Sequence, residues 1–416
     1  MDVERESTKR DLDASPPIRT KSTSSLAGWL NRLDEKQRRC LYELWIMFIL
    51  YVRQHDFRAD KRFQNNLELG TFLYKQLESA KIDLCKNPLD ANLIEKSGAA
   101  KELFMQAATD DLDTILLRFL RARKWKLPEA FSMLIDFLKW RIQVGVHRLL
   151  QEGERCLSPN LFKSGKSFTW GEDKKGRLCV YIRARLHDKN ANTIEENTRY
   201  VIYCLETGRR LRRYDEQRVI VVVDMSNLTW ASLDFPFAQM IMRFLQAYYP
   251  EILAHVLIVN APWMFWGFWK LLSSVLDPVV AAKFKWIEGD ELASYIGDSL
   301  PMEFGGKTFS FSQAFDRAKS IEEFEKREMD LDGLKRMRDL EAELLRVTAE
   351  IYRRNISAPA LEEERKSLKK QLRRGYYNLL RPVYPSTMYD RLDLFNVHDG
   401  SIDWSRYSKN ENENER

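Results

Sequence analysis

The chain has 416 residues, of which 44% are hydrophobic and 31% charged, so it holds enough apolar material for a sizeable core and is not a wholly disordered chain. Its 17 glycines are too few for a glycine-rich fibre. The net charge of +6 is compatible with an anionic membrane, with nucleic acid or with neither, so the position of the basic residues matters more than their number.

The cysteines and the apolar segments bear on the cellular compartment in which the protein is expected. The five cysteines are odd in number and include no Cys-x-x-Cys pair, which predicts a reducing compartment without a disulfide framework or a zinc site. Residues 1–17 contain no apolar stretch of the kind that a secretory signal requires. Elsewhere no uncharged apolar run approaches the roughly 18 residues of a membrane-spanning helix. We therefore expect a cytoplasmic protein that is soluble or peripherally membrane-associated.

The first third of the chain begins with a polar tail and continues with helices. Residues 1–25 are charged and contain proline and serine, which predicts a disordered tail. Apolar side chains at helical spacing predict a helical N-terminal extension over residues 26–108. Residues 109–150 are more strongly helical and predict a small helical subdomain, with Asp110 and Asp113 as candidate N-caps.

From residue 151 to residue 307 the pattern changes to strands that alternate with helices. Four short apolar runs rich in β-branched residues lie at 178–182, 219–223, 256–259 and 284–287. Amphipathic segments of helical length separate them. This alternation predicts the α/β class with a mainly parallel sheet and right-handed crossovers.

The last part of the chain returns to helical spacing. Residues 308–400 predict a helical C-terminal extension, in which 331–352 and 361–377 flank a Ser-Ala-Pro-Ala turn. No heptad repeat is sustained, so we expect an antiparallel hairpin rather than a coiled coil. Residues 401–416 are mostly polar and predict a second disordered tail.

The common signatures of catalysis and of metal binding do not occur in the sequence. It contains no Walker loop, no Gly-x-Gly-x-x-Gly, no His-Glu-x-x-His and no Gly-x-Ser-x-Gly. None of the five histidines is spaced with cysteine, aspartate or glutamate as a metal site requires. We therefore expect no enzyme activity, no metal and no cofactor.

Three places in the sequence carry charged groups suited to a phosphorylated ligand. Residues 118–126 include five cations, which suit phosphate but equally suit a solvated helix face. Glu251 follows Tyr-Tyr-Pro, where a carboxylate can accept hydrogen bonds from sugar or inositol hydroxyls or can be an ordinary surface acid. Lys283 follows a short helix that Pro278 can begin. A phosphate contact and the general preference of lysine for a helix C-terminus both explain that position.

Residues 263–276 are unusually rich in aromatic side chains. The rings are Trp263, Phe265, Trp266, Phe268 and Trp269. A helix that is apolar on nearly all sides must be buried on both faces, cover an apolar space or enter a membrane interface. We favour a lid or a membrane contact over a core helix with one tryptophan-rich end.

Six motifs together resemble the CRAL-TRIO lipid-binding family, and within it the phosphatidylinositol/phosphatidylcholine transfer proteins of the fungal type. They are LLRFLRARKW at 116–125, VVVDM at 221–225, YYPE at 248–251, NAPW at 260–263, LDPVVAAK at 276–283 and LPMEFGG at 300–306. Each is weak alone. Together they occur in the order of the family, at compatible spacing, over roughly residues 110–307.

The resemblance implies a CRAL-TRIO-like fold in which one phospholipid lies in an apolar pocket under a mobile gating helix, here 263–276. The head-group residues of phosphatidylinositol-binding members carry over onto Arg123, Lys124, Glu251 and Lys283. The gating helix would bring its five rings to a membrane. Two positions depart from the family: Val280 replaces a hydroxyl residue, and Asn227 stands where many members have glycine. These departures concern specificity for phosphatidylinositol rather than the fold.

We expect from this resemblance a protein that binds phosphatidylinositol or another glycerophospholipid and transfers or presents it between membranes. Its partners would be the phospholipid and, transiently, a membrane surface. The alternative is a lipid-sensing scaffold that recruits a protein partner through its helical flanks, the C-terminal extension above all. Nucleic-acid binding through the basic cluster is a minor alternative, and we expect no nucleic acid as a partner.

Overall fold

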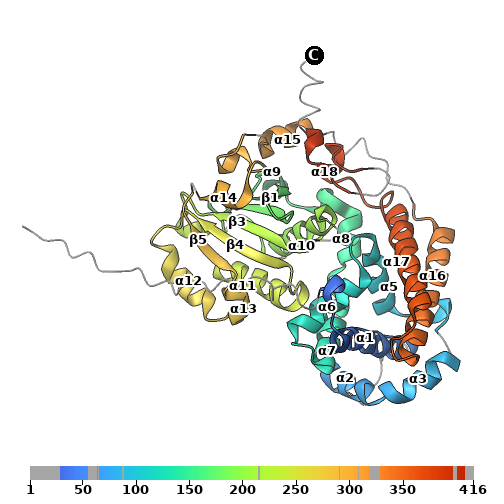
Figure 1. The fold of residues 1–416 in the computed structure, drawn as a ribbon. Helices are drawn as coiled ribbons and strands as arrows, with labels where there is room; N and C mark the ends of the chain where they lie inside the picture. The colour runs from blue at the N-terminus through green and yellow to red at the C-terminus, as the bar shows by residue number, and fades with distance from the viewer. Residues whose placement is uncertain are drawn as a thin grey trace, which may run out of the picture.

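The computed structural model describes residues 29–54, 63, 65–86, 89–213, 216–289, 291–307, 309–318, 328–396 and 401–407. The predicted tail at 1–25 and residues 408–416 of the second predicted tail lie outside the described residues. A sheet-containing half lies beside a helical half, and both ends of the chain contribute helices to the latter (Figure 1).

Five strands form one sheet. They are β1 (Ser167–Glu172), β2 (Leu178–Arg183), β3 (Val219–Asp224), β4 (Leu253–Val259) and β5 (Phe284–Ile287). The spatial order follows the chain, β1-β2-β3-β4-β5. The β1–β2 pair is antiparallel and the three other pairs are parallel. This confirms the predicted α/β class with a mainly parallel sheet. The sequence pattern missed β1 because its residues mix polar and aromatic side chains instead of forming an apolar run.

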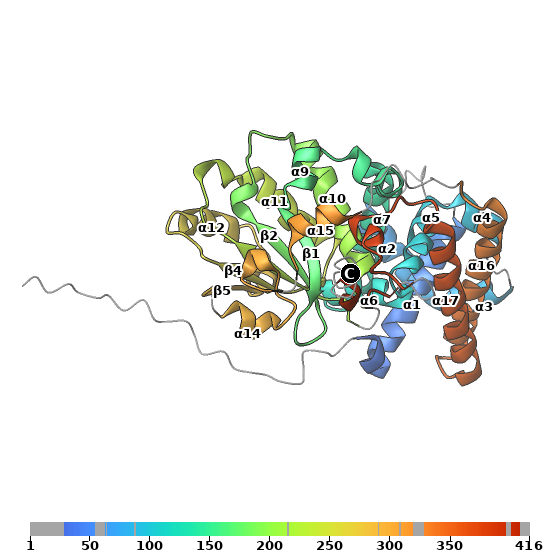
Figure 2. The same cartoon turned by 90° about the horizontal axis from the view of Figure 1, so that it is seen from above.

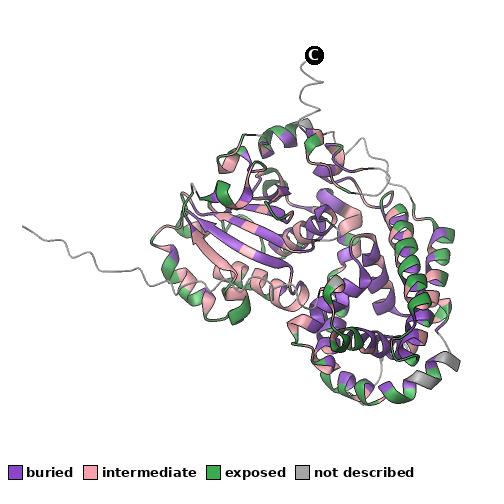
Figure 3. Ribbon diagram, in the orientation of Figure 1, coloured by how far each residue is buried: buried purple, intermediate pink, exposed green. Residues whose placement is uncertain are grey.

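Helices connect the strands and cover the sheet. They are α9 (Pro159–Lys163), α10 (Ile194–Leu211), α11 (Phe235–Arg243), α12 (Phe265–Ser273), α13 (Pro278–Ala281), α14 (Leu292–Ile296) and α15 (Phe311–Arg317). A capping box fixes the start of α10, since Thr193 and Glu196 each accept a hydrogen bond from the other's backbone N–H. Buried residues run along the strands and continue into the helical half (Figure 3).

The helical half contains segments from both ends of the chain. Its N-terminal helices are α1 (Glu35–Arg53), α2 (Asn66–Lys75), α3 (Leu77–Lys86), α4 (Ala91–Lys96), α5 (Gly98–Met105), α6 (Leu112–Ala122), α7 (Leu127–Val144) and α8 (Val146–Glu152). Its C-terminal helices are α16 (Leu331–Arg353) and α17 (Pro359–Leu380). The short α18 (Met388–Arg391) lies instead against the sheet half, where Tyr389 Oη accepts a hydrogen bond from Thr169 N of β1 at 2.8 Å. The helices α16 and α17 pack on each other as a hairpin, and α16 also packs on α1, α3 and α4. Figure 2 shows these segments side by side.

The cap of α6 differs from the expected one. Asp111 is the N-cap and accepts a hydrogen bond from Thr114 N at 3.1 Å, whereas Asp110 and Asp113 were expected in that role. Both of those side chains are instead buried in ion pairs, Asp110 with Arg118 and Asp113 with Arg365. Spacing alone did not separate the capping acid from its two neighbours, and the structure buries all three side chains.

Residues 401–407 also correct an expectation, since they are ordered and packed rather than part of a disordered tail. Ile402 forms an isolated bridge with Phe395, and Tyr407 is 2% exposed. The ring of Trp404 lies 4.9 Å from that of Trp170 on β1. Tyr407 is buried and Trp404 is half-buried against the first strand, which stabilises the segment.

Candidate functional site

An apolar cavity of about 280 Å³ lies between the sheet and three helices. Strands β2 to β5 form its floor with Val180, Ile182, Val221, Val223, Val256 and Ile258. The side chains of α10, α11 and α12 close it from the other side, α12 with Phe265, Phe268, Trp269 and Leu272. Apolar side chains therefore continue from the sheet into a space that no side chain fills, as a lipid chain requires.

A wider and more polar cavity of about 1050 Å³ adjoins the apolar one. Met242, Leu245 and Leu253 line both cavities, so the two meet at the start of β4 and the end of α11. The C-terminal end of α6, the loop before β4 and the segment around α13 form the rest of its wall. We call this wider cavity the charged mouth.

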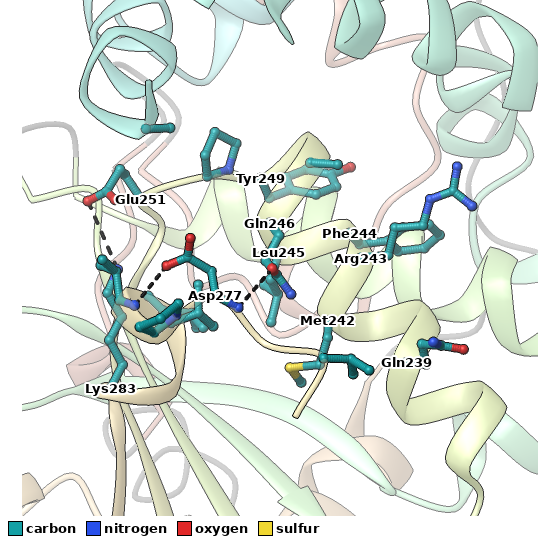
Figure 4. Close-up of a pocket in the computed structure, with 18 of the residues that line it drawn as sticks. Gln239, Met242, Arg243, Phe244, Leu245, Gln246, Tyr249, Glu251, Asp277 and Lys283 are labelled. Atoms are coloured by element: carbon teal, nitrogen blue, oxygen red, sulfur yellow. Dashed lines mark hydrogen bonds and ion pairs between the residues drawn. The ribbon is translucent and has the colours of Figure 1, made fainter. Parts of the chain in front are cut away.

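All four predicted head-group residues line the charged mouth. Arg123 and Lys124 come from the end of α6. Glu251 comes from the loop before β4 and Lys283 from the residues that follow α13, and Figure 4 shows these two side chains. Lys283 Nζ lies 4.0 Å from Glu251 Oε2, and these side chains are 18% and 30% exposed. The fold thus gathers three cations and one carboxylate at one opening, and their role in binding stays a prediction.

Backbone conformations that are rare for non-glycine residues hold two of these side chains. Lys124 has φ 51° and Glu251 has φ 60°, both in the left-handed region. Such conformations cost roughly 1–3 kcal/mol each and persist where the surrounding structure enforces them, often at binding sites. Lys283 is held differently. Its N–H donates to Val280 O at 3.0 Å, at the end of a turn that Asp277 begins by accepting from Val279 N at 2.7 Å.

The wall of the mouth is tied to both the sheet half and the helical half. Residues Phe244–Tyr248 form a π-helical turn, in which Gln246 Oε1 accepts a hydrogen bond from Asp277 N at 3.2 Å. Single π-helical turns are frequent at functional sites. Next in the chain, Tyr249 donates to Glu206 Oε1 at 2.7 Å. Burial opposes ionisation of Glu206, but the charges of Arg141 and Arg209 outweigh it and lower its pKa to about 2.

The predicted basic cluster at 118–126 divides into three roles. Arg118 is buried and pairs with Asp110 at 2.8 Å, so it supports the fold. Arg123 and Lys124 are exposed and line the mouth. Lys126 pairs with Glu129 on the surface at 3.0 Å. Two of the five cations therefore fit the interpretation as a solvated or structural helix face, and the other three line the mouth.

Sequence reasoning missed two cations of the mouth, Arg121 and Arg243, and the aromatic neighbour of Arg121. Arg121 also lines the mouth, and its guanidinium carbon lies 4.4 Å from the ring centroid of Trp29. The guanidinium of Arg218 lies 5.0 Å from the same ring. Burial lowers the pKa of Arg121. The position of Arg121 within the basic cluster could have indicated its place in the mouth. No pattern in the neighbouring sequence indicated that Trp29, from the N-terminal extension, lies against Arg121.

The five rings of the predicted gating helix divide between cavity and solvent. Trp263 precedes α12 and is 81% exposed, and Trp266 is 50% exposed. Phe265, Phe268 and Trp269 line the apolar cavity, so in this arrangement they do not fit the expected membrane contact. The reason is the amphipathic placement of α12, which turns one row of rings toward the sheet.

The two departures from the family pattern lie in different places. Val280 lines the charged mouth, where the family's hydroxyl is expected. Asn227 has φ 54° in the exposed loop after β3 and lines neither of the two cavities. Asparagine tolerates this left-handed conformation better than most residues, so it can replace glycine there. Only the first departure bears on the predicted head-group site.

Neither a membrane-spanning helix nor a metal cluster is found in the described part of the chain. Among its helices none is long and apolar enough to cross a bilayer. Its histidines, cysteines and acids nowhere gather in a group of three or more that could hold a metal ion.

Comparison with known proteins places these observations in a family. The sequence model of the CRAL/TRIO domain matches residues 162–306, and that of the CRAL/TRIO N-terminal domain matches residues 74–136. A CRAL-TRIO domain-containing protein of Schizosaccharomyces pombe is 31% identical over 73% of this chain and 88% of its own length. A second protein of that description from the same organism is 31% identical over 68% of this chain and 66% of its own length. The phosphatidylinositol transfer protein CSR1 of Eremothecium gossypii is 32% identical over 52% of each chain.

Proposed function

This chain belongs to the CRAL/TRIO family, and from that membership we propose that it binds one glycerophospholipid and transfers it between membranes. The observation that carries the proposal is the pair of adjoining cavities, one apolar beneath α12 and one charged at its opening. Together they match an amphiphile with a phosphorylated head. The name of the relative CSR1, a phosphatidylinositol transfer protein, supports the same class of ligand.

The energetics of transfer explain why such a protein needs a cavity and no reaction. Each acyl CH₂ exposed to water costs about 0.8 kcal/mol, so a two-chain lipid that leaves a bilayer unaided meets a barrier of tens of kcal/mol. An apolar cavity reproduces the bilayer interior, and exchange becomes nearly neutral. No bond is made or broken, which is why we propose a carrier rather than an enzyme.

The position of α12 sets how much lipid the apolar cavity accepts. With α12 where it lies, the cavity measures about 280 Å³, at the small end of ligand pockets, which span roughly 300–1,000 Å³. Two acyl chains therefore require α12 to move away from the sheet. Such a movement would carry Trp263 and Trp266 outward, and tryptophan partitions well into the membrane interface. On this basis we propose that the protein attaches transiently to membranes.

The charged mouth suits an anionic inositol head group. Arg123, Lys124 and Lys283 offer cations to a phosphate, and Glu251 offers acceptors to ring hydroxyls. The apolar side chain of Val280 offers neither a cation nor a hydrogen-bond acceptor. We propose phosphatidylinositol as a ligand on these grounds, with phosphatidylcholine or another glycerophospholipid as the alternative in the same cavity.

Two measurements on the full-length protein test the proposed function. Mass spectrometry of lipid extracted from the purified protein is expected to give one glycerophospholipid class at near-stoichiometric amount. Transfer of labelled lipid between donor and acceptor vesicles is expected to be accelerated by the protein. If the protein carries no lipid, even after incubation with mixed vesicles, and transfer is not accelerated, the proposal is wrong.

The scaffold alternative has less support. Apolar side chains of α16, Leu344 and Ile351 among them, are buried, and α16 packs on α1, α3 and α4 rather than presenting that face to a partner. A capture experiment with residues 308–416 alone would expose this internal face and would be misleading. The full chain is the appropriate bait.

A further inference from the structure

Polar side chains occupy the end of the apolar cavity that lies away from the charged mouth. The mouth meets the cavity at Leu253, the first residue of β4. Lys166, His187 and Asp234 also line the cavity, but they adjoin the carboxyl ends of β2 and β3. Because parallel strands run in one direction, these two groups lie at opposite ends of the cavity. We call this second group, with Asn197, the inner polar cluster.

The inner polar cluster is a connected set of three buried side chains and the half-buried Asp234. Lys166 is 5% exposed, and its Nζ lies 3.1 Å from His187 Nδ1 and 3.5 Å from Asn197 Oδ1. His187 Nε2 lies 3.1 Å from Asp234 Oδ2. Since the carboxylate can only accept, Nε2 carries the hydrogen and Nδ1 accepts from the Lys166 ammonium. Burial and then the Lys166 charge lower the pKa of His187, so the imidazole is neutral at pH 7.

The positive charge of Lys166 is only partly compensated in this environment, because burial lowers the pKa of Lys166 to about 8 although the charge of Asp234 acts in the opposite direction. Within the described ranges its hydrogen-bond partners are an imidazole nitrogen and an amide oxygen, and it forms no ion pair with a carboxylate. The nearby thiol of Cys204 stays neutral, because burial raises its pKa to about 12. The ring centroids of Phe237 and Tyr200, at 5.2 and 5.5 Å, are its other close neighbours. A cation in such a place attracts an anion that can reach it through the cavity.

We propose that Lys166 binds the carboxylate of a single-chain acidic lipid, a long-chain fatty acid, whose tail lies along the apolar cavity toward Leu253. One ammonium matches one carboxylate, whereas a phosphodiester with its head group would bring further polar atoms to a wall that is otherwise apolar. The volume of about 280 Å³ beneath α12 also suits one chain better than two. The inference stands on the apolar cavity and does not depend on the head-group assignment at the mouth.

A binding experiment with two matched ligands tests the proposal. Oleate and oleyl alcohol differ at the head and share the chain, and their affinities for the delipidated full-length protein are measured by calorimetry. We expect wild type to bind oleate about tenfold or more tightly than the alcohol, as a charge-assisted bond implies. Lys166→Met keeps the length of the side chain and is expected to remove this preference, with alcohol binding unchanged within about twofold. Lys283→Met, the matched change at the mouth, is expected to keep the preference.

Two results of this binding experiment would overturn the proposal. One is equal binding of oleate and oleyl alcohol by wild type; the other is a loss of oleate binding in Lys283→Met as large as in Lys166→Met, which would place the anion at the mouth. Thermal unfolding checks that the variants are folded. A crystal structure of wild type with oleate needs no variant. Its carboxylate is expected within hydrogen-bond distance of Lys166 Nζ, and a carboxylate beside Lys124 or Lys283, or a phospholipid head group against Lys166, would contradict the inference.

Discussion

Asp113 and Arg365 lie 252 residues apart in the chain and form a buried ion pair through two hydrogen bonds. Arg365 Nη2 lies 2.6 Å from Asp113 Oδ1, and Nη1 lies 2.7 Å from Oδ2. Lys369 adds a third contact to Asp113 at 2.6 Å, and Thr348 Oγ1 accepts from Arg365 Nε at 2.8 Å. The C-terminal hairpin is thereby fixed to α6, which lies in the part matched by the CRAL/TRIO N-terminal model.

Loss of this pair is expected to destabilise the whole chain. Arg365→Met leaves the carboxylate of Asp113 buried with Lys369 as its remaining cation, and should lower the free energy of unfolding by about 3–5 kcal/mol. Arg346→Met is the matched control. Arg346 is 46% exposed and pairs with Glu343 on the same helix, so its loss should cost less than about 1 kcal/mol. Urea denaturation measures both. Similar small losses in the two variants would show that the hairpin is not needed for stability.

The sequence predicted the sheet well and the helical packing poorly, for physical reasons. The apolar runs that became β2 to β5 are local, so a short window contains their signal. Asp110 and Asp113 could not be told from Asp111 as caps, because their partners, such as Arg209 and Arg365, are distant in the chain. The packing of residues 401–407 on β1 was not predicted for the same reason, because the residues in contact are distant in the chain.

The candidate site likewise contains residues that the sequence predicted and residues that it did not. The resemblance carried Arg123, Lys124, Glu251 and Lys283 to one cavity, although no local pattern joins them. The inner polar cluster has no such motif. Its contacts span 21 residues from Lys166 to His187 and 47 residues from His187 to Asp234, so only the fold brings these side chains together.

Acid is expected to weaken the contact between α8 and the segment after α17. His147 Nδ1 lies 2.6 Å from Tyr384 Oη, and burial, with the charge of Arg141, lowers the pKa of His147 to about 4 from the usual 6.5. Between these pH values the unfolded chain binds the proton and the folded chain does not, so the free energy of unfolding falls as the pH falls through that window. At about 1.4 kcal/mol per pKa unit the full contribution is about 3.5 kcal/mol, of which about 2–3 kcal/mol is lost between pH 7 and pH 4.

A substitution separates this histidine from the others. His255, whose pKa is also lowered to about 4, acts in the same window and remains in His147→Gln. The variant should therefore keep part of the pH dependence of wild type and lose about 2–3 kcal/mol of it. Chemical denaturation at pH 7, 5.5 and 4 measures the difference. Parallel curves for wild type and variant would mean that His147 is protonated in the folded state.

The two exposed tryptophans at the start of α12 are expected to contact membranes. Trp263→Ser with Trp266→Ser should weaken association with anionic vesicles by about tenfold or more, since each buried large apolar side chain contributes roughly 1.5–3 kcal/mol. Leu331→Ser is the control, because Leu331 is 68% exposed on α16. Vesicle co-sedimentation measures the partition coefficient. A loss of equal size in the control would indicate a non-specific apolar effect instead of a docking surface.

Lys283 is expected to select an anionic head group. Lys283→Met should reduce loading of phosphatidylinositol by about tenfold, the size of one charge-assisted hydrogen bond. Loading of phosphatidylcholine should fall less, because its own choline cation balances the phosphate charge. Glu251 is 30% exposed and stays hydrated without its partner, so the fold should tolerate the change. Lys270→Met on α12 removes an exposed lysine that does not line the mouth and is the matched control. If loading of both lipids falls equally, Lys283 shapes the mouth without recognising the head.

A substitution of Val280 is expected to increase the binding of phosphatidylinositol. It is half-buried on the wall of the mouth, between Asp277 and Lys283, where related proteins are expected to carry a hydroxyl. Threonine has nearly the shape of valine, and its hydroxyl can be hydrated when the mouth is empty. Val280→Thr should therefore raise loading of phosphatidylinositol over phosphatidylcholine by about 2–10-fold, the effect of one neutral hydrogen bond of roughly 0.5–1.5 kcal/mol. Should the hydroxyl be responsible, a smaller apolar side chain will not have the same effect.

The control is Val280→Ala, which removes volume and adds no hydroxyl and should not raise loading of phosphatidylinositol over phosphatidylcholine. Competition between the two lipids, read by mass spectrometry of the loaded protein, gives the ratio of their loading. An unchanged ratio in the threonine variant would mean that the inositol ring does not reach α13, and would confine recognition to the side of the mouth formed by Arg123 and Lys124.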